Sequence, residues 1–187
     1  MSRYGWTIAL GALLAALAIP ALAARSLVVS LIPAQGPEVA VADLRLEDSG
    51  AYRLIYRSAP FTPHFLSMRP FECLNAAPRL QCHLPYPYAK GHRVSADDLA
   101  DLSYDLLFLV KQAGEYGVDF WNGRYYRLSW EGDTIVGQAM AADMNILASR
   151  PPAGNDRPLK PVDLIDIAAS DTPYPRLRIA PLPKELP

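Results

Sequence analysis

The sequence predicts an α+β fold, in which an antiparallel sheet of hairpins carries one main helix on a face and a proline-rich C-terminal strap. Short segments of alternating apolar and polar residues, separated by turn residues, are typical of strands joined in hairpins. One stretch, residues 95–113, has apolar residues at helical spacing. Half of the 18 prolines lie in residues 150–187, which favours an extended or irregular chain there.

The first 23 residues have the features of a secretory signal peptide. A single Arg3 precedes an uncharged run over Trp6–Ile19, and small residues follow up to Ala23, after which we expect cleavage. The run is shorter than the roughly 20 residues that span a bilayer. The alternative is an uncleaved membrane anchor, because apolar character continues in residues 27–32, past Arg25. We therefore expect a periplasmic or secreted protein with no membrane span after cleavage.

Two regions are expected behind the leader: an α+β domain over residues 24–149 and a proline-rich extension over residues 150–187 that packs on the domain or trails from it. The chain has 18 Lys and Arg against 19 Asp and Glu, and removing Arg3 with the leader leaves 17 against 19, a net charge of −2. A nucleic-acid-binding protein is expected to carry a basic surface, so this class is disfavoured. The sequence predicts no oligomeric state.

Residues 39–47 and 51–57 are predicted to form a hairpin around a turn at residues 48–50. Arg53 and Arg57 share one face of the second strand. We interpret this face as solvated, and the alternative is an anion-binding strip.

The two cysteines of the chain are predicted to form a disulfide across a second hairpin. A turn at residues 76–78 pairs residues whose numbers sum to 155, which places Cys73 opposite Cys82. Directly opposed residues have Cα atoms about 4.5–5.5 Å apart, within the range that a disulfide bridges. Closing a loop of about ten residues stabilises a fold by roughly 2.5–3 kcal/mol in the chain-entropy model. A redox-active pair is disfavoured because the spacing is not Cys-x-x-Cys.

His83, next to the second cysteine, suggests two further interpretations. With Cys73 and Cys82 it would make a metal site, but strand alternation directs His83 away from Cys82, and no second cysteine pair completes a zinc site. The predicted register also places Glu72 opposite His83. This histidine and carboxylate are the basis of an alternative function, a small periplasmic hydrolase.

The main helix is predicted over residues 95–113. Ser95 is the expected N-cap, Asp98 takes the capping-box position, and Gly114 is a natural stop. An apolar stripe is expected to pack on the sheet, whereas the aspartates opposite it are interpreted as solvated. The stripe consists of Leu99, Leu102, Leu106, Leu109 and Ala113. The aspartates are Asp97, Asp101 and Asp105.

A three-stranded meander is predicted after the helix. Asn122-Gly123 favours a type I′ turn, and residues 130–134 contain a second turn. The last strand covers residues 135–138. Residues 139–147 fit a strand or a helix, and the sequence does not decide between them.

The meander is unusually rich in aromatic residues. Because Tyr125 and Tyr126 are neighbours in a strand, they face opposite sides of it. One face is expected to join the core and the other to expose aromatic rings beside polar groups, a surface that suits a protein or a glycan. The alternative is that the helix and the tail cover both faces. The candidate binding residues are Trp121, Asn122, Arg124, Tyr125, Tyr126 and Trp130.

The sequence contains no Gly-x-Ser-x-Gly, His-Glu-x-x-His, Walker or dinucleotide glycine motif. It predicts no cofactor, no metal site and no catalytic residues. The leading hypothesis is an exported, non-catalytic binding or accessory protein of the cell envelope, which uses the aromatic surface against an envelope protein or a glycan. The alternative is the small hydrolase with His83 and Glu72.

Overall fold

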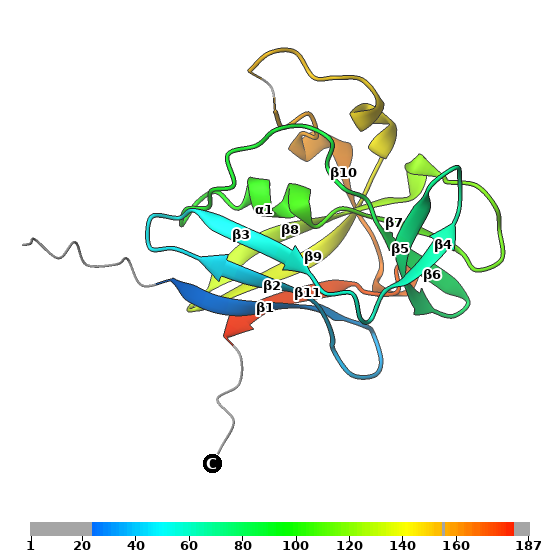
Figure 1. Ribbon diagram of the computed structural model, residues 1–187, viewed down its shortest axis with the longest axis horizontal. Helices are drawn as coiled ribbons and strands as arrows, with labels where there is room; N and C mark the ends of the chain where they lie inside the picture. The colour runs from blue at the N-terminus through cyan, green and yellow to red at the C-terminus, as the bar shows by residue number, and fades with distance from the viewer. Residues whose placement is uncertain (1–23, 155, 182–187) are drawn as a thin grey trace, which may run out of the picture.

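The computed structural model describes residues 24–154 and 156–181, which form a curled half-barrel of antiparallel strands (Figure 1). The predicted signal peptide lies outside the described residues. Along the sheet the strands follow the order β3-β2-β1-β11-β9-β8-β7-β6-β5-β4, and β10 pairs with β9. The strands are β1 (Arg25–Ile32), β2 (Val39–Leu46), β3 (Tyr52–Tyr56), β4 (Thr62–Phe65), β5 (Pro70–Ala76), β6 (Arg79–His83), β7 (Phe108–Gln112), β8 (Gly123–Glu131), β9 (Thr134–Ala142), β10 (Leu164–Asp166) and β11 (Arg176–Pro181).

Helical structure in the described part of the chain is limited to short segments. The α-helix α1 has only 6 residues, so the predicted α+β fold with one main helix packed on a sheet is wrong. The fold is instead built by the sheet curling on itself. The helical segments are α1 (Ala100–Asp105) and the 3-10 turns η1 (Phe120–Asn122), η2 (Met144–Ala148), η3 (Pro161–Asp163) and η4 (Ala169–Asp171).

The predicted helix over residues 95–113 divides into α1 and strand β7. Ser95 still caps a turn, because its hydroxyl accepts the N–H of Asp98 at 3.1 Å. After α1 the chain enters β7, which pairs with β6 on one side and β8 on the other. Phe108 and Leu109 are neighbours in β7, yet they are only 0% and 3% exposed. A strand covered on both faces has a continuous apolar sequence, which fits helical spacing equally well.

The C-terminal segment contributes to the centre of the sheet, which corrects the predicted strap. β11 lies between β1 and β9, so the first and last strands of the described chain pair with each other. Leu177 is opposite Leu31 of β1 and Gly137 of β9, and it is only 1% exposed. The alternating Arg-Leu-Arg-Ile sequence of residues 176–179 is typical of a strand, but prolines on both sides favoured an irregular chain.

The predicted cystine hairpin is confirmed. Cys73 in β5 and Cys82 in β6 are directly opposed and joined by a disulfide, with their Cα atoms 3.9 Å apart. Leu74 pairs with Gln81 in the same register. The local hairpin pattern was therefore sufficient to predict both the covalent link and the register around it.

The ladder between β5 and β6 ends at Cys73 and Cys82, one step before the predicted pair of Glu72 and His83. Glu72 is opposite Pro63 of β4, whereas His83 is opposite Phe108 of β7. β5 pairs with β4 on its other side and β6 pairs with β7, and both outer ladders include the cysteines. These outer partners come from other parts of the chain, so the hairpin sequence alone did not reveal them.

Two of the three aspartates expected on a solvated face are largely buried and form ion pairs. Asp101 is 2% exposed and contacts Arg157 at 2.7 Å. Asp105 contacts the ammonium group of Lys90 at 2.7 Å and accepts a hydrogen bond from the Tyr52 hydroxyl at 2.6 Å. These contacts connect α1 to β3, to the loop before α1 and to the segment after residue 150.

The hairpin of β8 and β9 has one of the two predicted turns. Glu131 is opposite Thr134, so Gly132 and Asp133 form a two-residue turn, with Gly132 at a positive φ of 59°. Of the two central residues only Gly132 has a positive φ, which is the pattern of a type II′ turn with glycine at the first central position. β9 continues to Ala142 and η2 follows, so the ambiguous residues 139–147 form a strand and then a 3-10 turn.

The predicted turn at Asn122-Gly123 is wrong. Asp119 accepts hydrogen bonds from the N–H of Trp121 at 3.0 Å and from the side-chain amide of Asn122 at 2.7 Å, which stabilises η1. Gly123 begins β8, where a Cβ would lie 2.4 Å from the carbonyl oxygen of Ala142. Glycine is therefore needed here for close backbone packing and not for a turn.

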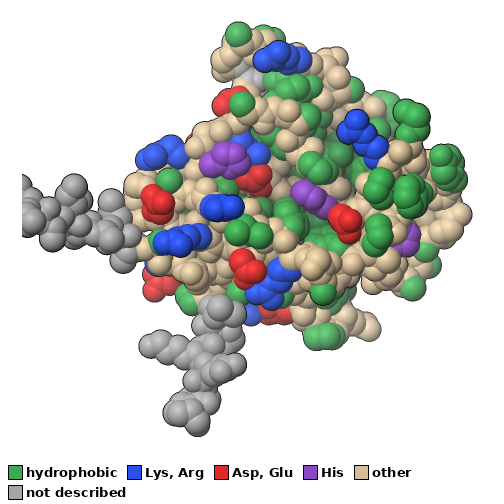
Figure 2. All heavy atoms as spheres, in the orientation of Figure 1, with side chains coloured by type: hydrophobic (Ala, Val, Ile, Leu, Met, Phe, Trp, Pro, Cys, Tyr) green, Lys and Arg blue, Asp and Glu red, His purple; other side chains and the backbone are tan. Residues whose placement is uncertain are grey.

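The face shown in Figure 2 separates charged from hydrophobic side chains. Charged groups gather over β1, β2 and β3, and hydrophobic groups gather over β4, β5 and β6. Phe65 in β4 is 71% exposed, and Met68 in the following turn is 99% exposed. Within the described residues, no helix has the length and apolar character needed to cross a membrane.

Candidate functional site

A row of four residues crosses the middle of the sheet on its solvent-facing side. Arg127 in β8 is opposite Gln138 in β9, Gln138 is opposite Arg176 in β11, and Arg176 is opposite Ile32 in β1. Since neighbouring strands lie about 4.7–4.9 Å apart, the backbones of Arg127 and Arg176 are roughly 9–10 Å apart, with Gln138 between them. The register thus places two guanidinium groups on either side of one amide.

A second row lies one step further along the same strands. Ser129 is opposite Val136, and Val136 is opposite Arg178. The residues between the two rows, such as Leu128 and Leu177, point to the other face because side chains alternate along a strand. Leu177 joins the main core there, and Leu128 packs against it. This alternation is the reason that the arginines remain on the outer face.

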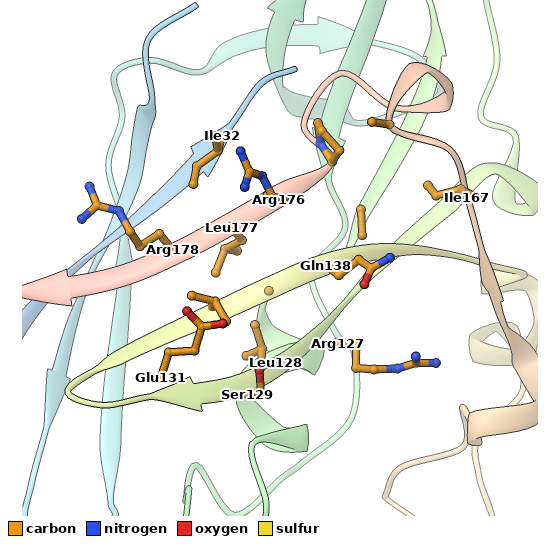
Figure 3. Close-up of a pocket in the computed structure, with 15 residues that line it drawn as sticks. Ile32, Arg127, Leu128, Ser129, Glu131, Gln138, Ile167, Arg176, Leu177 and Arg178 are labelled. Carbon is orange, nitrogen blue, oxygen red and sulfur yellow. The ribbon is translucent and has the colours of Figure 1, made fainter. Parts of the chain in front are cut away.

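The chain between β10 and β11 forms a wall beside these rows. β10 pairs with the end of β9 and β11 pairs with its beginning, so the connecting residues 167–175 pass from one to the other alongside the sheet. Ile167 on this connection faces a hollow of about 690 Å³, which we call the arginine groove. Figure 3 shows Gln138 between Arg127 and Arg176, with Ile167 on the neighbouring segment. The groove is defined here by Arg127, Ser129, Gln138, Ile167, Arg176 and Arg178.

The arginines of the groove differ in their ion pairing. Arg178 contacts the carboxylate of Glu38 at 2.7 Å. Arg127 and Arg176 are exposed, and neither has an ion-pair partner within residues 24–154 and 156–181. Glu131 lies at one end of the groove. The centre of the groove therefore offers two guanidinium groups whose donors are free for a carboxylate.

Tyr125 and Tyr126 are buried on opposite faces of β8, so neither ring is part of an exposed binding surface. Tyr125 is 9% exposed and packs edge-on against Tyr104. Tyr126 is fully buried, donates a hydrogen bond to the carbonyl oxygen of Tyr174 at 2.8 Å and accepts one from Gln81 at 3.0 Å. Burial raises the pKa of the Tyr126 phenol, which keeps it protonated. Both tyrosines belong to the core.

The other candidate residues of the aromatic segment are dispersed. Trp121 in η1 is 70% exposed and Asn122 beside it is also exposed. Trp130, at the far end of β8, is partly buried and donates a hydrogen bond from its indole N–H to the carbonyl oxygen of Ser95 at 3.0 Å. Arg124 is only 6% exposed. The structure therefore does not assemble these six residues into one aromatic surface.

The structure places His83 against aromatic rings and Glu72 at the surface. The His83 ring contacts the rings of Tyr56 and Phe108, with centroid distances of 4.0 and 5.8 Å. Burial lowers the pKa of His83 to about 4, so the imidazole is neutral at ordinary pH. Glu72 is exposed, and in the described part of the chain no hydrogen bond or ion pair joins its carboxylate to His83. The arrangement gives the hydrolase alternative no support.

Cys73 and Cys82 are joined to each other in the structure. Both sulfur atoms take part in the disulfide, so they are not available as the metal ligands considered from the sequence. Among the described residues, no group of three or more His, Cys, Asp or Glu side chains is placed to hold a metal ion.

The groove was not recognised from the sequence, although part of its pattern was visible. Arg127 and Ser129 alternate with Leu128, and Arg176 and Arg178 alternate with Leu177, as expected of outward-facing strand residues. Alternation does not reveal the strand order, in which β8 and β11 both pair with β9. No protein-family model, curated protein or solved structure matches the chain.

Proposed function

We propose that the protein is an exported, non-catalytic binding protein that holds an acidic segment of another envelope protein in the arginine groove. The observation that carries the proposal is the placement of Arg127 and Arg176 on either side of Gln138, without carboxylate partners in the described chain. Guanidinium groups bind carboxylates through paired N–H donors, and the amide of Gln138 adds a donor and an acceptor between them.

The apolar part of the groove favours a protein segment over a glycan. Val136 and Ile167 lie beside the arginines, so the groove alternates positive charge with aliphatic surface. A polypeptide offers the matching combination of carboxylates and apolar side chains. Glycan rings suit the faces of aromatic side chains, and no aromatic residue in the described chain lines this groove.

β9 is paired along both of its sides near the groove, with β8 on one side and β11 or β10 on the other. Its backbone donors and acceptors are therefore already engaged, and an incoming segment would not add to the sheet as another strand. Binding would use side chains from β8, β9 and β11. Such binding is expected to weaken with added salt, because exposed charges are screened.

The export part of the proposal is supported by the disulfide. Disulfides persist in oxidising compartments such as the periplasm or the extracellular space. The bond between Cys73 and Cys82 is present in the structure, and the leader in residues 1–23 has the pattern of a signal peptide. The two features point to the same side of the membrane.

Calorimetric titration with a synthetic peptide that repeats Glu-Glu-Val-Val tests the proposal. When extended, this peptide presents a carboxylate and an apolar side chain alternately on each face. The double substitution Arg127→Glu and Arg176→Glu is expected to weaken binding about tenfold or more, because like charges then oppose each other. The protein must keep its circular dichroism spectrum for the comparison to hold.

Arg45 and Arg53 provide a matched control. They are exposed and directly opposed on β2 and β3, away from the groove. The double substitution Arg45→Glu and Arg53→Glu makes the same change in net charge, and we expect it to leave the affinity nearly unchanged. Equal losses in the two variants, or no binding by the native protein, would contradict the proposed site.

A further inference from the structure

A second hollow, separate from the arginine groove, lies where β6 and β8 begin and β7 ends. Its volume is about 350 Å³, and its lining includes Arg79 of β6, Lys111 of β7 and Arg124 of β8. We call it the Arg124 pocket. Arg124 was singled out in the sequence as a binding residue, but the arginine groove does not use it.

Arg124 carries a buried charge that forms no ion pair in the described protein. Its guanidinium group donates hydrogen bonds to the carbonyl oxygens of Gly123 at 2.8 Å and Asp171 at 3.0 Å, and both acceptors are neutral. Its Nε is buried and has no hydrogen-bond partner. Burial also lowers the pKa of the Arg124 guanidinium, since the charged form is desolvated. Buried arginines are normally paired with a carboxylate or another anion.

The other two cations of the pocket have the same kind of partner. Arg79 donates to the carbonyl oxygen of Ser170 at 2.9 Å, and Lys111 donates to the carbonyl oxygen of Gly117 at 2.6 Å. Within residues 24–154 and 156–181, none of the three cations forms an ion pair. Backbone carbonyls hold the three side chains in place, and no carboxylate in the described chain contacts them directly.

Acidic side chains also reach the pocket, but two of them are engaged within their own turns. Asp119 accepts hydrogen bonds from η1, as described above. Asp171 accepts the N–H of Ala168 and the hydroxyl of Ser170, both at 3.3 Å. Glu115 is exposed on the loop after β7. Asp171 attracts the Arg124 charge from a distance, but none of these carboxylates forms an ion pair with it in the described chain.

The backbone around Arg124 is held tightly, which makes the pocket a preorganised site. Gly123 packs directly against the backbone of Ala142, and Arg124 is opposite Phe108 in β7 and Ala141 in β9. The position of its guanidinium group is further restrained by the carbonyl oxygen of Asp171 in η4. A ligand would not have to order this residue, so less entropy is lost on binding.

We propose that the Arg124 pocket binds a small oxyanion, a carboxylate or phosphate group, with Arg124 as the anchor and Arg79 and Lys111 at its sides. Such a group supplies the negative charge and the acceptors that Arg124 lacks, in the paired geometry that guanidinium favours. The site does not depend on the proposed function, because it shares no residue with the arginine groove.

Calorimetric titration of the whole protein with inorganic phosphate and, separately, with malonate tests this site at constant ionic strength. We expect one or both anions to bind, and chloride not to compete at equal concentration. Binding of phosphate alone or of malonate alone would support the site and identify its ligand class. Failure of both to bind would overturn the proposal.

Three variants locate the binding. Arg124→Gln should abolish it, and the double substitution Arg79→Gln and Lys111→Gln should weaken it about tenfold, because charge-assisted hydrogen bonds are lost. The second variant changes only partly exposed side chains, so it is expected to fold. It therefore tests whether the anion binds in the Arg124 pocket even if Arg124→Gln does not fold. Arg127→Glu with Arg176→Glu should bind the anions as the native protein does. Native affinity in the Arg79 and Lys111 variant would contradict the assignment.

Discussion

The imidazole ring of His83 lies over the phenol ring of Tyr56, with 4.0 Å between their centroids and 35° between their planes. Tyr56 belongs to β3, which is one edge of the sheet, and His83 ends β6, the third strand from the other edge. The Tyr56 hydroxyl also donates to the carbonyl oxygen of Asp105 at 2.8 Å. These contacts bring distant strands of the sheet together and keep the half-barrel curled.

Acid is expected to destabilise the protein through His83. Its pKa is lowered to about 4 in the folded state by burial, whereas the unfolded chain has the ordinary value of 6.5. The unfolded state therefore binds the extra proton first as the pH falls. Stability is expected to be complete above pH 6.5 and to decrease by about 3 kcal/mol as the pH falls to about 4. Urea unfolding at several pH values measures this loss.

The substitution His83→Phe provides the control for that pH dependence. Phenylalanine keeps a ring against Tyr56 but cannot be protonated. The difference in unfolding free energy between the native protein and this variant should change with pH between 6.5 and 4, whereas contributions from carboxylates cancel. A constant difference over this range would show that His83 is not responsible.

Asp105 is expected to be one of the most sensitive positions for stability. The substitution Asp105→Ala leaves the ammonium group of Lys90, whose side chain is only 7% exposed, without its carboxylate and removes the acceptor of the Tyr52 hydroxyl. Breaking a buried ion pair in this way costs about 3–5 kcal/mol. Asp97→Ala, at an exposed position on the same segment, should change stability by less than about 0.5 kcal/mol. Urea unfolding that gave the same midpoint for both variants would refute this role of Asp105.

The disulfide is expected to stabilise the hairpin of β5 and β6 by constraining the unfolded chain. Replacing both Cys73 and Cys82 by alanine should lower the unfolding free energy by about 2–3 kcal/mol, because the loop between them is short. Adding a reductant should shift the urea midpoint of the native protein and leave that of the double variant unchanged. If reductant moved both midpoints equally, the effect would not come from this bond.

The sequence predicted the features that depend on neighbouring residues. The register around Cys73 and Cys82, the turn at Gly132 and the hairpin of β2 and β3 follow from local alternation and turn chemistry. The stretch Phe108–Gln112 is predicted as helix because Leu109 continues the helical spacing of apolar residues that begins at Leu99. It becomes a strand because β6 and β8 cover its backbone, and both partners are set by tertiary structure.

The candidate site was harder to predict for the same reason. Alternation shows that Arg127 and Arg176 face outward from their strands, but only the insertion of β11 between β1 and β9 brings both of them beside Gln138. An exposed aromatic surface is predicted for the aromatic segment because the sequence does not show that β8 lies in the interior of the sheet, between β9 and β7. Packing on the two faces of the sheet buries its tyrosines, Tyr125 in a cluster with Tyr104 and Tyr126 in the main core.

Mapping the bound peptide onto the structure is the most direct test of the proposed function. Amide and arginine Nε chemical shifts of the ¹⁵N-labelled protein would be followed during titration with the Glu-Glu-Val-Val peptide. We expect shifts concentrated on β8, β9 and β11 around Gln138, together with shifts of the Nε signals of Arg127 and Arg176. Shifts concentrated instead around Trp121, or no shifts at all at saturating peptide, would contradict binding in the arginine groove.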